Sequence, residues 1–258
     1  MFLNDFNFDL PEELIATRPA SPRTSARLLV AKANKIHDST VNELPKYLKP
    51  GDRLVFNDTK VLPARLNGVR NRLIETDKLA CSKIEVTLLK LKKQGIWSAL
   101  IKPLRKVKIG EKIFFDKNLE AKLIDKIDGR ASLRFNIKGS ELLKRLNDIG
   151  TMPLPPYIAT KRQADKRDNF DYQTVFARKL GSVAAPTASL HFDEALLDEI
   201  KNNGVHTSFV TLHVGAGTFL PVKDEEIKKH KMHAEYGEIS QQTVEEINKT
   251  QKDGGRII

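Results

Sequence analysis

Apolar residues recur with helical spacing in two segments of the second half of the chain, 193–203 and 240–252. Each segment carries apolar side chains three or four positions apart, on one predicted face: Leu196, Leu197, Ile200, Val244 and Ile247. The first segment begins at Asp193, a residue type that caps helices, and is closed by Gly204. We therefore predict two amphipathic helices, with a strand at 205–214 between them.

The pattern changes to short strand-like runs between about residues 68 and 139. Gly, Asn and Asp turns separate five of them: 83–91, 96–101, 112–115, 119–127 and 131–135. Strands this short and this evenly spaced predict a small antiparallel β-barrel. The whole pattern predicts an α/β fold class: a mixed-sheet main domain formed by 1–67 and 140–258, with the barrel inserted at 68–139.

Further elements of the main domain are predicted on both sides of the barrel. Residues 27–31 and 53–57 have the composition of strands, and 140–149 form a helix that Ser140 caps and Gly150 ends. Residues 256–258 are predicted to begin another strand. Because strand edges need partners, we expect this chain to be C-terminally incomplete.

Composition narrows the class of protein. The 258 residues, 40% of them hydrophobic, can bury a sizeable core. The single Cys81 excludes a disulfide framework and a cysteine zinc site, and it fits a reducing compartment. The chain start lacks the features of a signal peptide, and no apolar run reaches the about 20 residues that a membrane helix needs. We expect a cytoplasmic protein without membrane association.

The formal net charge of +11 favours an acidic partner such as nucleic acid. The lysines are scattered along the chain, and no aromatic RNA-binding signature accompanies them. A second interpretation is therefore a basic chain whose charges are solvated on all faces.

Two segments of small residues with histidine stand out, 181–192 and 211–219. The first offers polar groups at alternate positions through Thr187, Ser189 and His191, and the second repeats a histidine, small residues, Thr and Phe. Small side chains allow a ligand or a neighbouring segment to approach the backbone. A tightly packed loop would have the same composition, but the repetition predicts two walls of one pocket.

These segments carry a resemblance, together with 152–158, 172–176 and 230–235. They resemble the S-adenosylmethionine:tRNA ribosyltransferase-isomerases, the family of the queuosine pathway. The resemblance runs from Asp5 to the last residue and implies a mixed α/β domain with an inserted β-barrel. It also implies that the proteins of this family extend beyond the last residue of this sequence.

The family reaction transfers the ribosyl part of S-adenosylmethionine to 7-aminomethyl-7-deazaguanine (preQ1) in tRNA, with isomerisation to epoxyqueuosine and release of adenine and methionine. It requires a base beside the sulfonium, a proton donor for adenine and a dry pocket that tolerates a cation. Histidine suits both proton transfers. S-adenosylmethionine is consumed as a substrate, so the resemblance implies no cofactor and no metal.

The resemblance and the pocket hypothesis together select the candidate residues. The catalytic candidates are His191, His213, His230, His233 and Glu235, with His213 and His233 ahead of the others. The substrate-binding candidates are Asn57, Thr59, Tyr157, Tyr172, Gln173, Pro186, Thr187, Phe192, Gly215, Gly217 and Thr218. The aromatic rings of Tyr157, Tyr172, Phe192 and Phe219 are expected to face the cation. The RNA-binding candidates are Arg23, Arg27 and Arg65.

Two other functions remain open at this point. A metal hydrolase would use His230, His233 and Glu235 with His191 or His213, although this spacing matches no established zinc motif. A truncated remnant would bind RNA without catalysis, and for the chain alone we expect little transferase activity. The partners expected for the enzyme are tRNA carrying preQ1 and S-adenosylmethionine, bound to a monomer.

Overall fold

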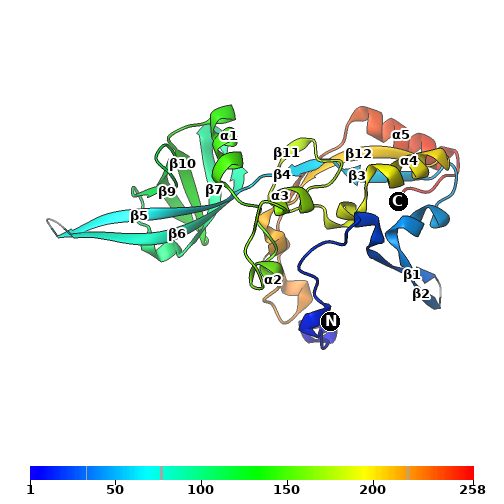
Figure 1. Ribbon diagram of the computed structural model, residues 1–258, viewed down its shortest axis with the longest axis horizontal. Coiled ribbons are helices and arrows are strands. Elements are labelled where there is room, and N and C mark those ends of the chain that lie inside the picture. The colour runs from blue at the N-terminus through cyan, green and yellow to red at the C-terminus, as the bar shows by residue number, and fades with distance from the viewer. Residues whose placement is uncertain (33, 76–77, 220) are drawn as a thin grey trace.

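The protein is elongated, with a β-barrel at one end and a mixed sheet with helices at the other (Figure 1). The computed structural model describes residues 1–258 apart from residues 33, 76–77 and 220. This arrangement confirms the predicted α/β class with an inserted antiparallel barrel. The domain boundaries at 67/68 and 139/140 remain predictions. Among the helices described, none has the length and apolar character needed to cross a membrane.

The barrel is closed by antiparallel strands in the order β10-β7-β6-β5-β8-β9. Their bounds are β5 Arg65–Glu75, β6 Lys78–Leu91, β7 Ile96–Lys102, β8 Lys112–Phe114, β9 Glu120–Ile127 and β10 Arg130–Phe135. Alternate residues of β10, Ala131, Leu133 and Phe135, are buried, as expected for a strand with one face on a core. Helix α1 (Gly139–Ile149) adds Leu142 and Leu146 to that core.

Strand β5 corrects the sequence prediction, which gave the barrel five strands rather than six. Its alternate positions Leu66, Gly68 and Arg70 lack the apolar repetition by which a buried strand face is recognised. Gly68 is required there because a Cβ would lie 2.8 Å from the Phe114 carbonyl oxygen. Helix α1 differs as well: it begins at Gly139, so Ser140 is inside the first turn and does not cap it.

The main sheet has the order β13-β12-β3, with β3 (Arg53–Asn57) parallel to β12 (His206–His213) and β13 (Tyr236–Glu238) antiparallel to β12. Residues 256–258 continue this sheet beside β3, where the Val55 amide donates to the Ile258 carbonyl at 2.8 Å. Of the strand predicted at 256–258, the structure has an isolated parallel bridge between Ile257 and Arg53. Strands β4 (Thr59–Val61) and β11 (Lys179–Ser182) pair in parallel, and β1 (Arg27–Lys32) and β2 (Lys35–Thr40) form a hairpin.

Helices cover both faces of this sheet. Helix α4 (Glu194–Asn202) packs Leu196, Leu197 and Ile200 into the core that contains Phe209 of β12. Helix α5 (Gln241–Lys252) contacts Ser208, the neighbour of Phe209 on β12, through the Glu246 carboxylate. Because adjacent strand residues point to opposite faces of a sheet, α5 covers the other face. The buried residues of α5 are Thr243 and Thr250, whereas Val244 and Ile247, predicted to form its apolar face, are only half-buried.

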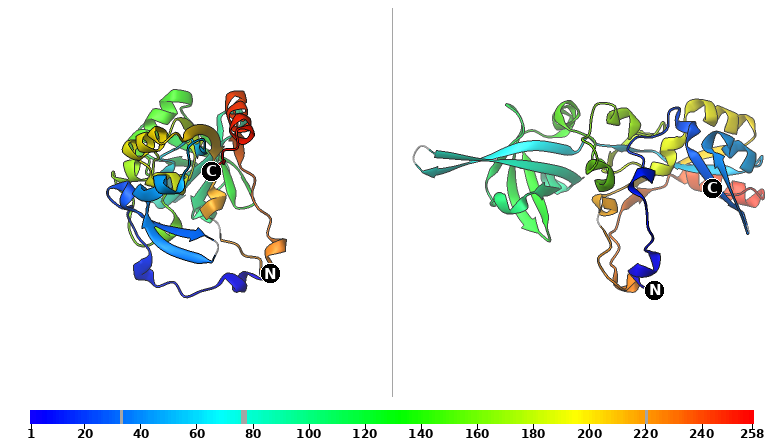
Figure 2. Two further views of the ribbon diagram at one scale, coloured as in Figure 1. Left: turned by 90° about the vertical axis from the view of Figure 1, so that its right-hand side faces the viewer. Right: turned by 60° about the horizontal axis from the view of Figure 1, so that its bottom comes forward.

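The remaining helices are short, and many of them are single 3-10 turns. Their bounds are α2 Pro156–Ala159, α3 Asp168–Asp171, η1 Leu3–Phe6, η2 Glu12–Leu14, η3 Arg23–Ser25, η4 Val41–Tyr47, η5 Lys93–Gly95, η6 Leu104–Lys106, η7 Thr187–His191, η8 Ala216–Phe219 and η9 Ile227–Lys229. The N-terminal segment and the segment before β13 extend together away from the main body (Figure 2), and the Leu3 amide donates to the Glu225 carbonyl at 2.8 Å.

Candidate active site

His213 is held by its neighbours at the carboxyl end of β12. The Thr59 hydroxyl lies 2.7 Å from Nδ1, so Nε2 is the ring nitrogen left for other chemistry. A Cβ on Gly181 would lie 2.7 Å from Cε1, so only glycine permits the ring to sit where it does. The Tyr236 ring lies nearly parallel to the imidazole, at 18° with centroids 6.3 Å apart. These contacts fix the orientation of a half-buried imidazole.

The surroundings of His213 favour its neutral form. Burial lowers the pKa of the imidazole below its usual value of 6.5, and the positive charges of Lys179 and Lys90 lower it further. The carboxylates of Glu238 and Asp58 oppose this shift without cancelling it. At neutral pH the side chain is therefore uncharged and able to accept a proton.

His233 and Glu235 form a second arrangement with the loop that follows β12. The His233 Nε2 atom lies 3.1 Å from Glu235 Oε1, and the same oxygen accepts a hydrogen bond from the Gly215 amide at 2.8 Å. The His233 ring packs directly on Gly217, where a Cβ would lie 2.2 Å from Nδ1. A histidine paired with a carboxylate is a suitable donor or acceptor of a proton.

The segments 181–192 and 211–219 lie against each other, as the sequence predicts. The Val183 amide donates to the Val214 carbonyl at 2.9 Å, and the Ser182 hydroxyl donates to the same oxygen at 3.2 Å. This contact places Gly181 beside His213. The small side chains of both segments are therefore needed for the segments to approach each other and the histidine ring.

Of two further predicted site residues, Tyr172 is buried and His191 is half-buried. Burial raises the pKa of Tyr172 to about 12, a hydrogen bond from the Ala185 backbone opposes the shift, and the nearby Tyr157 adds to it. Burial lowers the pKa of His191, and the charge of Arg23 lowers it further. Tyr157 itself is 55% exposed.

Other predicted ligand residues have partners within the protein. The Gln173 amide accepts from the Val61 nitrogen at 3.1 Å and donates to its carbonyl at 2.7 Å. The Asn57 amide accepts from the Leu212 nitrogen at 3.0 Å and donates to the Leu212 carbonyl at 2.8 Å. The Phe192 ring lies edge-on to Phe56 in the aromatic core. These side chains position the strands that carry the site.

The three predicted RNA-binding arginines differ in their surroundings. The Arg23 guanidinium donates to the backbone carbonyls of Phe170, Gln173 and Leu190. Arg65 pairs with Glu85 across the barrel strands β5 and β6. The Arg27 side chain is 86% exposed and lies 3.8 Å from Asp38, so it is accessible to a partner.

Pro186 is half-buried, and Thr187 and Thr218 are exposed. Sequence reasoning missed Tyr236 and Lys90, which lie near His213. Tyr236 directly follows the predicted Glu235, which is a signal that could have been used. Lys90 belongs to the barrel, and nothing in its sequence neighbourhood links it to the histidine.

The two histidines of the metal-hydrolase motif contact different carboxylates. His230 Nδ1 lies 3.5 Å from Asp224, whereas His233 contacts Glu235. Within the described part of the chain, no group of three or more His, Cys, Asp or Glu side chains is arranged to hold a metal ion.

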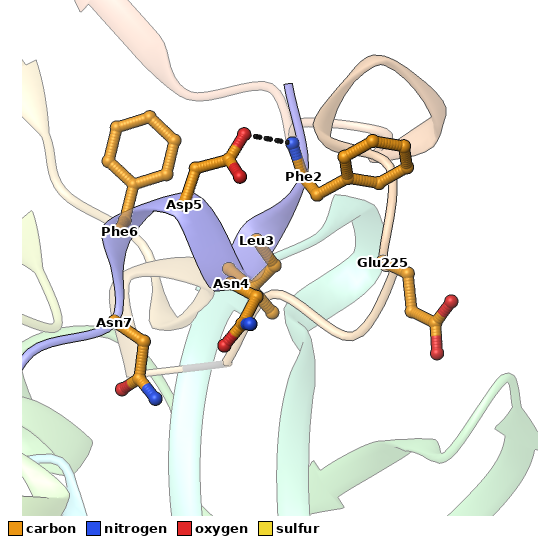
Figure 3. Close-up of a pocket in the computed structure, with 7 residues that line it drawn as sticks. All are labelled: Phe2, Leu3, Asn4, Asp5, Phe6, Asn7 and Glu225. Atoms are coloured by element: carbon orange, nitrogen blue, oxygen red, sulfur yellow. Dashed lines mark hydrogen bonds between the residues drawn. The ribbon is translucent and has the colours of Figure 1, made fainter.

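A hollow of about 800 Å³ lies beside the N-terminal segment (Figure 3). Phe2, Asp5 and Phe6 line it with Glu225 opposite, and the Phe2 amide donates to Asp5 at 2.8 Å. None of the predicted site residues is among its lining residues. The histidine arrangements are therefore the better candidate for an active site.

Comparisons with known proteins cover all or nearly all of the chain. A sequence profile of the family described as queuosine biosynthesis protein matches residues 3–258. The S-adenosylmethionine:tRNA ribosyltransferase-isomerase of Roseobacter denitrificans is 60% identical over 258 residues, which are 100% of this chain and 73% of that protein. The corresponding protein of Ruegeria sp. strain TM1040 is 56% identical, over 100% of this chain and 74% of its own length. A crystal structure of S-adenosylmethionine tRNA ribosyltransferase from Thermotoga maritima covers 98% of this chain and 68% of its own, with 28% identity and a TM-score of 0.41.

Proposed function

Because this chain belongs to the family of queuosine biosynthesis proteins, we propose that it is an S-adenosylmethionine:tRNA ribosyltransferase-isomerase. The observation that carries the proposal is the 60% identity to a protein of that name over every residue of the chain. The arrangement of His213, His233 and Glu235 supports it, because the reaction needs two proton transfers. The substrate that we assign is tRNA carrying 7-aminomethyl-7-deazaguanine.

We assign the two proton transfers to different histidines. His213, neutral at the end of β12, removes the proton from the carbon beside the sulfonium of S-adenosylmethionine. His233, oriented by Glu235, supplies a proton to the departing adenine. The aminomethyl nitrogen of the tRNA base bonds to a ribosyl carbon and gives up a proton, and the bond from the ribosyl group to adenine breaks. Methionine leaves when its sulfur–carbon bond breaks as the epoxide forms. The proposal includes no metal and no cofactor, because the sulfonium is already an electrophile.

The cellular setting follows from the substrate. We propose that the protein acts as a monomer in the cytoplasm, where tRNA and S-adenosylmethionine are available. The scattered lysines that give the net charge of +11 would support RNA binding that weakens as salt is added.

Adenine release tests the proposed function. The protein is incubated with S-adenosylmethionine labelled in the adenine and with tRNA carrying 7-aminomethyl-7-deazaguanine, and free adenine is measured. Release with this tRNA, and none with the same tRNA carrying guanine, is the expected result. Binding of the modified tRNA without release would instead support the RNA-binding remnant, and the same assay measures how much activity the chain has by itself.

The acid limb of the pH profile tests the role of His213. We expect kcat for adenine release to fall as the pH drops through the lowered pKa of His213, because only the neutral imidazole accepts a proton. The midpoint of the fall should therefore lie below pH 6.5, the usual pKa of histidine.

Two variants should move this limb in opposite directions. Lys179→Met removes a positive charge that lowers the pKa, so the limb moves to higher pH, and Glu238→Gln moves it to lower pH. The other groups that face the ring, Asp58, Lys90 and Tyr236, are unchanged in both variants. A limb that stays in place in both would exclude His213 as the titrating group.

A further inference from the structure

The net positive charge of this protein is confined to the β-barrel. Residues 65–138, from the start of β5 to the residue before α1, hold 19 Lys and Arg residues and 8 Asp and Glu residues, a net charge of +11. The rest of the chain holds 25 residues of each kind and has no net charge. Although the lysines are scattered along the chain, the excess of charge lies at one end of an elongated molecule (Figure 1).

A group of exposed cations lies on the segment 102–108, which is the end of β7 and the turn that follows it. The segment carries Lys102, Arg105, Lys106 and Lys108, and all four residues are exposed. In the part of the chain that the structure describes, none of the four forms an ion pair, because the carboxylates that make ion pairs on the barrel do so with other cations. The positive charge of the segment is therefore available to a partner.

Neighbouring strands add further positive charge behind this segment. The Lys126 ammonium of β9 donates to a backbone carbonyl of the segment at 3.1 Å. Burial raises the pKa of Glu111, but a hydrogen bond from the Lys108 amide and the charge of Arg72 outweigh it and hold that pKa below 4.5. The carboxylate is therefore ionised and pairs with Arg72. The buried Arg70 acts on the same carboxylate, so two guanidinium groups share one negative charge.

The segment 102–108 lies at the end of the barrel that is remote from the histidines. Trp97, at the start of β7, and His213 line one cavity. Lys102 ends the same strand five residues further on. Because a strand rises about 3.3 Å per residue, Lys102 lies roughly 17 Å further along the barrel than Trp97. A surface at this distance takes no part in the chemistry, but it can hold another part of a large substrate.

The composition of the barrel surface indicates which form of nucleic acid it fits. The aromatic side chains of the barrel are Trp97, Phe114, Phe115 and Phe135, and none of these four is exposed. Proteins that bind single strands stack the bases on exposed aromatic rings. Base-paired RNA is instead recognised through its shape, its phosphates and its 2′-hydroxyls. Exposed cations without exposed aromatic rings therefore match the backbone of a paired stem.

We propose that the segment 102–108 binds the phosphate backbone of a base-paired stem of the tRNA, away from the nucleotide that is modified. The inference rests on the proposed function, because it gives the RNA substrate a second contact surface. The barrel holds the tRNA by charge, and the main domain carries the histidines that act on the substrates. This division accounts for the excess of positive charge on the barrel and its absence from the main domain.

The test measures binding of tRNA carrying 7-aminomethyl-7-deazaguanine by fluorescence anisotropy at several salt concentrations. In the triple variant Arg105→Gln, Lys106→Gln and Lys108→Gln we expect Kd to rise about tenfold or more. The slope of log Kd against log salt should fall by about 2 to 3, because three phosphate contacts are lost. The apparent KM for tRNA should rise in parallel, whereas kcat at saturating tRNA and the affinity for S-adenosylmethionine should stay within about twofold.

The matched control is the triple variant Lys49→Gln, Lys249→Gln and Lys252→Gln, which removes the same charge from exposed lysines of the main domain. An equal loss of tRNA affinity in both triple variants, or no loss in the barrel variant, would overturn the proposal. For the unchanged protein, a short RNA hairpin should compete with the tRNA better than a single strand of the same length, and equal competition would also overturn it. Failure of the proposed function appears differently, as no adenine release at any tRNA concentration while the two variants still differ in tRNA affinity.

Discussion

Replacing His213 by glutamine is expected to lower kcat for adenine release by about 10²- to 10⁴-fold, the usual contribution of a positioned base. Glutamine has an amide that can still meet the Thr59 hydroxyl, so the packing of Gly181 against the side chain is largely kept. What is lost is the nitrogen that accepts the proton. The apparent KM values for both substrates should change much less than kcat.

The measurement is single-turnover adenine release with both substrates saturating. His206→Gln is the matched control, because His206 begins the strand β12 that His213 ends and its side chain is exposed. The control should keep kcat within about twofold, as expected for a surface change away from the chemistry. If His213→Gln retained activity similar to that of the control, His213 could not be the base.

Much of the fold could be predicted because burial in this protein follows simple periodicities. Leu196, Leu197 and Ile200 lie on one helical face and were recognisable as core, and the strand-like run at 131–135 between turns predicted the barrel strand β10. Strand β5 was not predicted because Gly68 and Arg70 occupy positions where a barrel strand normally has apolar side chains. Close packing between strands, not hydrophobicity, decides the residue at Gly68.

The site was predictable only in part. The small-residue segments were expected to meet, and the hydrogen bonds to the Val214 carbonyl confirm that they do. The roles of Asn57 and Gln173 could not be predicted, because an amide that clamps a neighbouring backbone has the same sequence signature as one that binds a ligand. Lys90 reaches the site only through the packing of barrel on sheet, which no local pattern encodes.

Gly217→Ala is expected to lower kcat by about 10²-fold or more while leaving the thermal stability nearly unchanged. The added Cβ would lie 2.2 Å from His233 Nδ1 and 2.3 Å from Cγ, so the ring has to move away. His233 is only partly buried, and its ring can turn outward with little loss of packing. The hydrogen bond to Glu235, which orients the ring for catalysis, is lost in that movement.

Gly215→Ala in the same loop is the control for this prediction. Its Cβ would lie 3.6 Å from Glu235 Oε1, an ordinary contact, so kcat should remain close to that of the unchanged protein. A further comparison separates an effect on His233 from a general effect on the loop. If alanine at 217 acts by displacing the ring, it should add almost no loss to His233→Ala, because the displaced group is already absent. Independent, multiplying losses from the two substitutions would show that Gly217 acts elsewhere and that the histidine is not the group it positions.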